Sequence, residues 1–152
     1  MKIAVGADHG GFLLKDILLP YLKERGHEVI DVGAFSMQPL DDYPEISRAV
    51  SEAVLAGKAE RGILICGSGV GASVAANKFP GIRAAVCHDT FSAHQGVEDD
   101  DMNVLCLGGR IVGSELAKEI ADRFVSAEFS GAERHRRRLG KVKMIEEEFM
   151  KG

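Results

Sequence analysis

The chain has no apolar run approaching the roughly 20 residues that a bilayer-spanning helix needs. Its first residues, Met1–Gly6, read directly as a strand and lack the pattern of a signal peptide. Excess positive charge is also missing: the formal net charge is −4, which argues against a general nucleic-acid binder. There are only three cysteines, each in an apolar run, so a disulfide framework is not expected. We therefore expect a cytoplasmic protein with reduced thiols and no membrane association.

Short apolar runs alternate along the chain with longer amphipathic segments. The expected strands are 2–6, 28–32, 62–66, 83–87 and 104–107, and the expected helices are 12–25, 44–56, 70–78, 90–98 and 113–126. Strand and helix repeated five times are typical of a parallel sheet that is covered on both faces. The sequence thus predicts one α/β domain over residues 1–152, a three-layer α/β/α sandwich with a five-stranded, parallel, Rossmann-like sheet.

Residues that typically begin, break or end helices refine this prediction at a few positions. Gly26 suits the position just after the first helix, while Pro20 is expected to kink or split that helix. Thr90 suits the N-cap of the fourth helix. A last helix, about 132–150, has no strand after it. We expect this C-terminal helical arm, residues 131–152, to pack across a neighbouring molecule.

The segment Gly62–Gly71 carries the strongest functional signal. An apolar strand ends on Cys66, and Gly67, Gly69 and Gly71 then lead into a helix. Glycines allow a tight turn with outward-facing backbone N–H groups, which favour anionic oxygen and a thiolate at Cys66. A free cysteine can instead serve only as a small apolar side chain in the core, and we expect this structural role for Cys87 and Cys106.

Reactive side chains also follow the other expected strands. Asp8-His9 follow the first strand, His88-Asp89 the fourth, and Arg110 the fifth. Each of these groups alone is more readily explained by the preference of such polar residues for the turns that follow strands. Because ligands bind at the carboxyl ends of parallel strands, their joint placement at those ends favours one functional site.

Known loop patterns narrow the chemistry of that site. A phosphatase-type cysteine loop needs arginine where this chain has Ala72, and the loop ends Gly71-Ala72-Ser73 instead of with the Gly-Lys-Ser/Thr of a Walker A loop. The glycine spacing is not that of a dinucleotide-binding loop, and no cysteine or histidine spacing suits zinc. We therefore expect proton transfer, with no metal and no organic cofactor.

A basic cluster, 133–138, opens the last helix. Arg134 and Arg138 share one helical face and could hold a phosphate together, while Arg136 and Arg137 are better explained as a solvated face. A nucleic-acid patch is weakly supported, because no aromatic side chains are interleaved with the charges.

Taken together, these residues resemble the ribose-5-phosphate isomerase B family, which includes galactose-6-phosphate and allose-6-phosphate isomerases. The resemblance covers nearly the whole chain and rests on the motifs Ala7–Phe12, Asp42–Pro44, Ile65–Gly71, Ala75–Lys78, Gly81–Ala84, Asn103–Leu105, Gly108–Arg110 and Arg134-His135.

The resemblance implies a metal-independent aldose–ketose isomerase of a sugar phosphate, with ribose 5-phosphate and ribulose 5-phosphate favoured. It also implies a homodimer or homotetramer whose sites lie between subunits. The implied catalytic residues are Cys66 as the base, Ser68 where relatives often have threonine, and Asp99. The implied substrate-binding residues are Asp8, His9, Tyr43, Gly67, Gly69, Val70, Gly71, Asp100, Arg110, Arg134 and Arg138.

One departure from the family pattern concerns Asp99 and Asp100, where relatives usually have His-Asn or His-Asp. That histidine is the family's acid for opening the furanose ring. Either Asp99 donates the proton, or His88 or His94 replaces it, or ring opening is slow, or the substrate reacts in open-chain form, or activity is lost. The alternative function is accordingly a non-catalytic or altered-specificity sugar-phosphate binding protein, and a redox protein using Cys66 is a weaker third interpretation.

Overall fold

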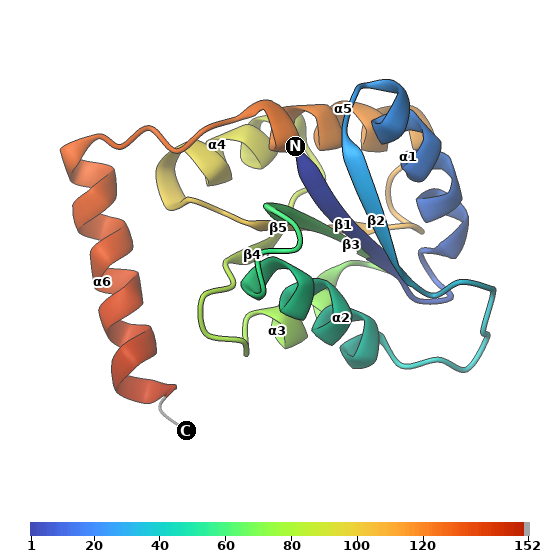
Figure 1. Ribbon diagram of the computed structural model, residues 1–152, viewed down its shortest axis with the longest axis horizontal. Helices are drawn as coiled ribbons and strands as arrows, with labels where there is room; N and C mark the ends of the chain where they lie inside the picture. The colour runs from blue at the N-terminus through green and yellow to red at the C-terminus, as the bar shows by residue number, and fades with distance from the viewer. Residues whose placement is uncertain (151–152) are drawn as a thin grey trace.

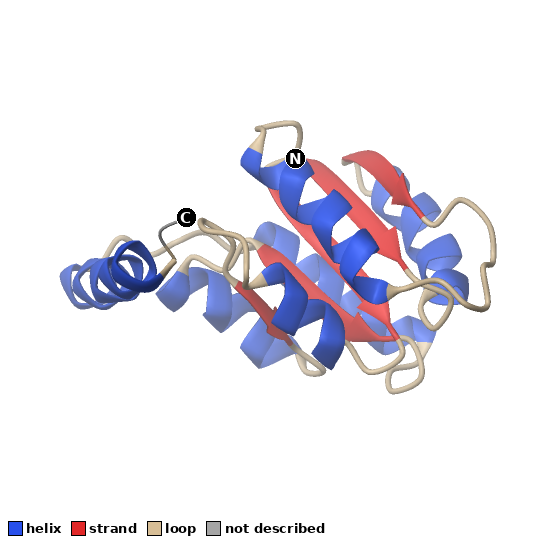
Figure 2. Cartoon of the chain, turned by 90° about the horizontal axis from the view of Figure 1, so that it is seen from below, coloured by secondary structure: helices blue, strands red, loops and turns tan. Residues whose placement is uncertain are grey.

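The computed structural model describes residues 1–150 and shows a parallel sheet between two layers of helices (Figures 1 and 2). Residues 151 and 152 of the predicted C-terminal arm lie outside the described part. The strands are β1 (Lys2–Ala7), β2 (Glu28–Gly33), β3 (Arg61–Cys66), β4 (Ala84–Val86) and β5 (Val104–Gly108). The helices are α1 (Phe12–Glu24), α2 (Tyr43–Leu55), α3 (Val70–Ala76), α4 (Thr90–Asp100), α5 (Ser114–Ser126) and α6 (Glu133–Phe149).

The sheet has the strand order β2-β1-β3-β5-β4, and all its pairs are parallel. Its three inner strands consist almost entirely of buried apolar residues, because helices cover both faces. Helices α1, α4 and α5 lie on one face, and α2 and α3 lie on the other (Figure 1). The three-layer α/β/α fold predicted from the sequence is thus confirmed.

This strand order creates a switch point between β1 and β3. After β1 the chain adds β2 on one side, and it then returns to place β3 on the other side. In open α/β sheets, the crevice outside the carboxyl ends at such a point is where ligands bind. Cys66 ends β3 there, with Gly108 of β5 as its register partner.

The structure differs from the sequence prediction at two helix positions. Helix α1 continues through Pro20 and is not split there. Buried Leu14, Leu18 and Leu22 hold its inner face, while Pro20 lies on the exposed side, where water can satisfy the carbonyl left without a partner. The N-cap of α4 is Asp89 instead of Thr90, since the Asp89 carboxylate accepts a hydrogen bond from the backbone N–H of Ser92 at 2.6 Å.

Helix α6 forms an arm that stands beside the edge strand β4 and helix α4 (Figures 1 and 2). It is tied to the domain at two points: Asp99 of α4 lies 3.3 Å from His135 Nε2, and the Glu146 carboxylate accepts a hydrogen bond from Gly81 N at 2.8 Å. Much of its apolar surface is not covered, because Val142 is 53% exposed and Phe149 is 75% exposed. Among the described residues, no helix has the length and apolar character needed to cross a membrane.

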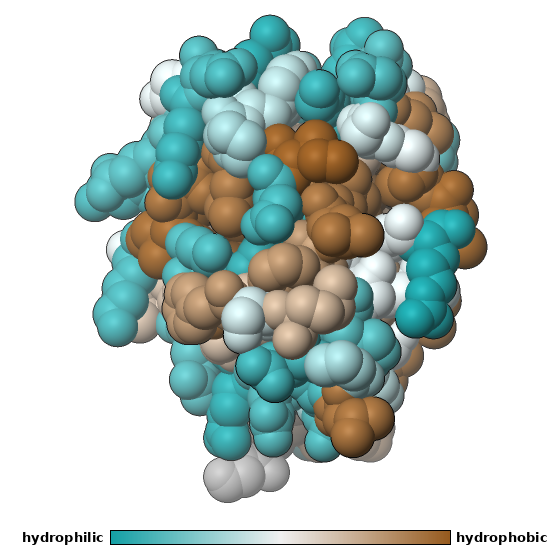
Figure 3. Space-filling model, turned by 90° about the vertical axis from the view of Figure 1, so that its right-hand side faces the viewer, coloured by the Kyte–Doolittle hydropathy of each residue, from teal (hydrophilic) through white to brown (hydrophobic). Residues whose placement is uncertain are grey.

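A second apolar surface lies on the face formed by α1, β2 and the connection 34–42. Figure 3 shows apolar groups gathered there between polar ones. The exposed apolar side chains of these segments include Leu13, Ile17, Phe35 and Leu40. This face and the arm are therefore two apolar surfaces that the chain's own helices leave uncovered.

Candidate active site

A cavity of about 360 Å³ lies at the carboxyl ends of β1, β3 and β5. It brings a thiol, a carboxyl group, a phenol and a guanidinium together with the glycine loop. Its lining residues are Asp8, Tyr43, Cys66, Gly67, Ser68, Gly71, Arg110 and Ile111. Seven of these eight residues are among those expected from the sequence to act or bind, so this is the candidate active site.

The Cys66 thiol lies at the base of this cavity. Only 6% of the residue is exposed, but its sulfur borders the cavity and accepts a hydrogen bond from the backbone N–H of Gly69 at 3.1 Å. Gly69 adopts a φ of 83°, and a Cβ there would stand 3.0 Å from the backbone carbon of Leu107. Only glycine fits this position, and its N–H favours negative charge on the sulfur.

The turn Gly108–Arg110 is joined to the loop through backbone hydrogen bonds. Gly109 N donates to the Cys66 carbonyl at 2.7 Å, and Arg110 N donates to the Gly67 carbonyl at 3.1 Å. The Arg110 guanidinium lies over Gly67, where a Cβ would be 3.3 Å from one of its nitrogens. Positive charge is therefore held at the rim of the cavity, close to the loop amides.

Asp8 and His9 leave β1 beside the loop. The Asp8 carboxylate accepts a hydrogen bond from Gly10 N at 2.9 Å, yet burial raises the pKa of this carboxyl. The His9 ring lies outside the cavity lining, and Asp41 holds it: Asp41 Oδ1 is 3.0 Å from His9 N and 2.8 Å from His9 Nδ1. Since a carboxylate only accepts, Nδ1 carries the proton and Nε2 is left for another partner.

These three side chains form one group that could offer ligands to a metal ion. One possible ligand atom from each of Asp8, His9 and Asp41 lies within 4.8 Å of the others. The contact between His9 and Asp41 has the geometry of a hydrogen bond, so it needs no ion to account for it.

The remaining loop residues differ in their access to the cavity. The Tyr43 ring forms one wall and packs so closely over Gly71 that a Cβ there would be 2.8 Å away. Ser68 is exposed at the mouth, and its hydroxyl accepts a hydrogen bond from Val70 N at 3.3 Å. Val70 and Gly69 do not line the cavity, although Gly69 reaches the thiol through its N–H.

Four expected site residues are not brought to this cavity by their own chain. Asp99 and Asp100 end α4, which starts after β4 and runs back toward the amino end of β5. Val104 at that end is four residues from Gly108, or about 13 Å along the strand. Arg134 and Arg138 are exposed on α6, on the left of Figure 1, whereas β1 and β2 end on the right.

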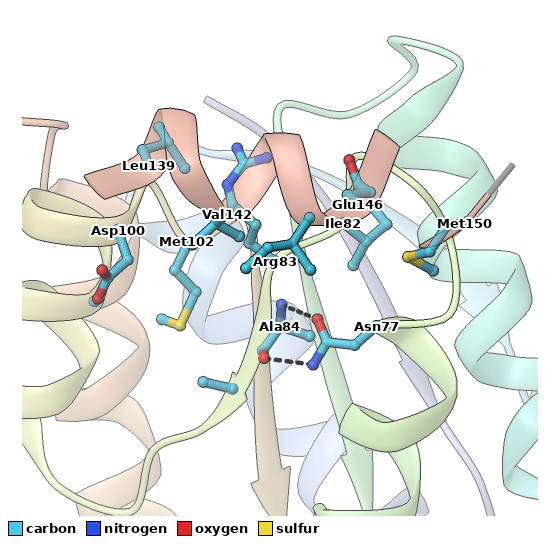
Figure 4. A pocket seen from close by; sticks show the side chains of 13 residues that line it. Asn77, Ile82, Arg83, Ala84, Asp100, Met102, Leu139, Val142, Glu146 and Met150 are labelled. Atoms are coloured by element: carbon cyan, nitrogen blue, oxygen red, sulfur yellow. Dashed lines mark hydrogen bonds between the residues drawn. The ribbon is translucent and has the colours of Figure 1, made fainter. Parts of the chain in front are cut away.

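A second cavity, of about 410 Å³, lies under α6 (Figure 4). Leu139 and Val142 of α6 point toward Ile82, Met102 and the edge strand, and Asp100 lies at its border. This cavity is lined mainly by apolar groups and holds no thiol, so it lacks the chemistry of the first.

The other two cysteines are buried, as the sequence predicts. Burial raises the pKa of Cys87 to about 11, and burial also raises the pKa of Cys106, which is fully enclosed between β3 and β4. Neither thiol lines the cavity at the strand ends.

Sequence reasoning missed two residues that the structure connects to the site: Asp41 holds His9, and Ile111 lines the cavity. His88, which the sequence places at the end of the fourth strand, accepts a hydrogen bond from Gly108 N at 2.9 Å. For Asp41 the one available signal was the length of the 33–42 connection, because long loops in compact domains are often functional.

Comparisons with known proteins agree with this geometry. Residues 3–142 match the family described as Ribose/Galactose Isomerase. The chain is 49% identical to ribose-5-phosphate isomerase B of Escherichia coli K12 over 96% of its own length and 97% of that protein. It is 42% identical to D-erythrulose-4-phosphate isomerase of Pectobacterium atrosepticum, with 86% of each chain covered.

Among solved structures, ribose-5-phosphate isomerase B of Clostridium thermocellum superposes with a TM-score of 0.94 at 49% identity. The superposition covers 98% of this chain and 99% of that one. The resemblance stated from the sequence is thus confirmed along nearly the whole chain: it belongs to the ribose/galactose isomerase family and is a sugar-phosphate isomerase.

Proposed function

We propose that this isomerase interconverts ribose 5-phosphate and ribulose 5-phosphate, with Cys66 as the base. The observation that carries the proposal is the position of the Cys66 sulfur, which borders the cavity while it accepts the Gly69 N–H at 3.1 Å. The names of the relatives from Escherichia coli and Clostridium thermocellum support the choice of sugar.

The reaction begins from the open-chain aldose. The Cys66 thiolate removes the proton from C2, the electron pair forms a C1–C2 double bond, and the aldehyde oxygen becomes an oxyanion. In this proposal, backbone N–H groups of the loop Gly67–Gly71 stabilise the enediolate, and Gly67, Ser68 and Gly71 are the loop residues that line the cavity. The thiol then returns the proton to C1 while a proton passes from O2 to O1, for which the Ser68 hydroxyl at the cavity mouth is the nearest carrier in the loop.

Binding of the substrate falls to the groups around the loop. The Arg110 guanidinium provides positive charge at the cavity rim, Asp8 and Tyr43 provide acceptors and a wall for the sugar, and His9 presents Nε2 from the edge. Together these groups suit a short polyhydroxylated chain that ends in a phosphate.

The remaining four residues act, we propose, from a second copy of the chain. Asp99, Asp100, Arg134 and Arg138 lie at the end of the domain opposite to Cys66, so a partner must present them. Uncovered apolar side chains of α6 and the apolar cavity beneath it offer a surface for such contact (Figure 4). We infer a homodimer, or a homotetramer built from two dimers, with sites between subunits.

Deuterium incorporation from D₂O tests the chemistry, with ribose 5-phosphate as substrate and NMR as the readout. The wild-type protein is expected to exchange the C2 proton, and Cys66→Ala is expected to abolish exchange while sugar-phosphate binding remains. Cys87→Ala is the matched control, because Cys87 is buried away from the cavity. Full turnover by Cys66→Ala would refute the assignment of the base.

Mixing two inactive variants tests the shared site. Cys66→Ala lacks the base, and the double variant Arg134→Ala/Arg138→Ala lacks the proposed phosphate contacts. In random hybrids, half of the dimers contain both variants and one intact site each, so about a quarter of wild-type activity should return. Hybrids that form by native mass spectrometry but stay inactive would contradict the arrangement.

A second candidate substrate is an open-chain tetrose phosphate. A four-carbon aldose phosphorylated at O4 has no free hydroxyl with which to close a furanose ring, so it needs no ring-opening acid. At the ring-opening position this chain has Asp99, which accepts a hydrogen bond from Gln95 Nε2 at 2.6 Å and lies 3.3 Å from His135 Nε2. Both contacts suit an acceptor better than a proton donor, and one similar relative is named for erythrulose 4-phosphate.

The two substrates are separated by comparing kcat/KM for ribose 5-phosphate and erythrose 4-phosphate in the wild type and in Asp99→His. If ring opening limits the reaction of ribose 5-phosphate, the variant speeds that substrate alone. A faster wild-type reaction with erythrose 4-phosphate assigns the tetrose, whereas binding of both sugars without exchange favours the non-catalytic alternative.

We also infer that the enzyme works in the cytoplasm. All three cysteines are free, and the proposed base has to stay a thiol, which a reducing compartment ensures.

A further inference from the structure

His88 occupies the point where the sheet ends beside the active site. The last backbone pairing between the β4 and β5 segments is Cys87 N to the Cys106 carbonyl at 3.3 Å. Beyond it, the His88 side chain replaces a backbone acceptor, because Gly108 N donates to His88 Nε2 at 2.9 Å. Since a backbone N–H can only donate, Nε2 carries no proton here and Nδ1 does.

Gly108, which donates this hydrogen bond, packs directly against the glycine loop of the candidate active site. A Cβ on Gly108 would stand 2.9 Å from the Ser68 backbone, so the strand end and the loop are in close contact. Through Gly109 and Arg110 the same turn donates its two hydrogen bonds to the Cys66 and Gly67 carbonyls. A shift of the turn would therefore move the loop and the Arg110 side chain together.

We propose that neutral His88 is a positioning residue for the isomerase site, and that its protonation releases the Gly108–Arg110 turn. A protonated imidazole has N–H groups on both nitrogens and cannot accept from Gly108 N. The bond is thus present at high pH and is lost as pH falls. The kinetic part of this proposal depends on the proposed function, while the structural part does not.

The charged and titratable groups around His88 come from three elements. Asp89 is the N-cap of α4, and its carboxylate is held by Ser92 N; that bond is the main cause of its lowered pKa, and attraction to His88 is a smaller one. The Cys66 thiol ends β3, and Arg110 follows the turn after β5.

This role differs from that of a ring-opening acid, which was one of the possibilities for His88 in the sequence. The ring does not line the cavity, and the nitrogen that faces β5 is occupied as an acceptor. His88 therefore acts on the reaction through Gly108 and not by contact with the sugar.

Two variants and one control separate this proposal from a general structural role. His88→Gln supplies an amide oxygen that can accept the Gly108 N–H and does not titrate, whereas His88→Ala supplies no acceptor. His27→Gln removes an imidazole at the opposite end of the sheet, just before β2, and controls for the loss of a titrating group.

The readouts are kcat/KM as a function of pH and the amide resonance of Gly108. In the wild type, both should change as pH is lowered and the His88 imidazole becomes protonated. His88→Gln should keep the neutral-pH activity and a Gly108 resonance that does not change with pH, and it should keep only the part of the fall in kcat/KM that comes from protonation of the Cys66 thiolate. His27→Gln should behave as the wild type. His88→Ala should lose up to about tenfold in kcat/KM relative to the wild type at high pH, the value of one net hydrogen bond, and this deficit should shrink at low pH, where the wild type has lost the bond as well.

The proposal is overturned if the fall of kcat/KM at low pH is the same in His88→Gln as in the wild type, or if the Gly108 resonance does not respond to protonation of His88. If the wild type isomerises neither ribose 5-phosphate nor erythrose 4-phosphate, the proposed function fails. In that case the Gly108 resonance still tests the hydrogen bond, so the two failures are distinguishable.

Discussion

Gly69→Ala is a direct test of how tightly the glycine loop is built against the sheet. Gly69 has a φ of 83°, a backbone conformation that costs an alanine about 1 to 2 kcal/mol. The new Cβ would stand 3.0 Å from the backbone carbon of Leu107 and 3.2 Å from its oxygen. These atoms belong to a central strand and cannot move aside as a flexible side chain can.

The magnitude follows from adding the two effects. Backbone strain together with overpacking against β5 should lower the free energy of unfolding by about 2 to 5 kcal/mol. Gly57→Ala isolates the strain, because Gly57 has a φ of 74° with no atom within 4 Å of the new Cβ. Gly113→Ala has neither effect, since its φ is −75° and its surroundings are open, and should stay within about 0.5 kcal/mol.

Urea unfolding of the three variants at one protein concentration measures these differences, and kcat/KM is measured in parallel. Gly69→Ala should also lose at least about tenfold in kcat/KM, because the N–H that Cys66 accepts has to shift. Gly57→Ala and Gly113→Ala should keep their activity. If Gly69→Ala is no less stable than Gly57→Ala, the close contact with β5 has no energetic consequence and the reasoning is refuted.

Two further predictions concern side chains at and near the site. Asp41→Ala should raise KM by several-fold with a smaller change in kcat, because His9 loses both hydrogen bonds that orient it; an unchanged KM, measured in steady-state assays, would contradict this role. Iodoacetamide at about pH 8 should modify Cys66 before the other thiols, because raised pKa values, about 11 for Cys87, keep Cys87 and Cys106 protonated at that pH. Peptide mass spectrometry checks the order, and equal labelling of Cys87 would disprove it.

The sequence predicts the secondary structure well because its signals are local. Buried strands are continuous apolar runs, and Gly26 ends α1 with a φ of 90°, as expected of a residue just after a helix. The two differences are also local in origin. At Pro20 the tertiary packing of buried leucines outweighs the lost N–H, and at the start of α4 two adjacent residues can both cap a helix, of which Asp89 does so.

The positions of some site residues can be predicted from the topology of the sheet, and the positions of others cannot. Asp8, Cys66 and Arg110 follow parallel strands at their carboxyl ends, and so their meeting in one cavity is predictable. Asp99 ends a helix that runs antiparallel to the strands, which places it at the opposite edge. The contact between Asp41 and His9 has no periodic signal, since the connection that carries Asp41 belongs to neither a helix nor a strand.

Burial alone does not distinguish the proposed base from the inert thiols. Cys66 is 6% exposed and Cys87 is 4% exposed, a difference too small to explain different chemistry. What separates them is the neighbouring backbone: the β3 strand ends at Cys66, and a left-handed glycine three residues later turns its N–H back onto the sulfur beside the cavity. The chemistry of this thiol is therefore set by the conformation of Gly69, so a substitution that preserves Cys66 and alters this turn should inactivate the enzyme.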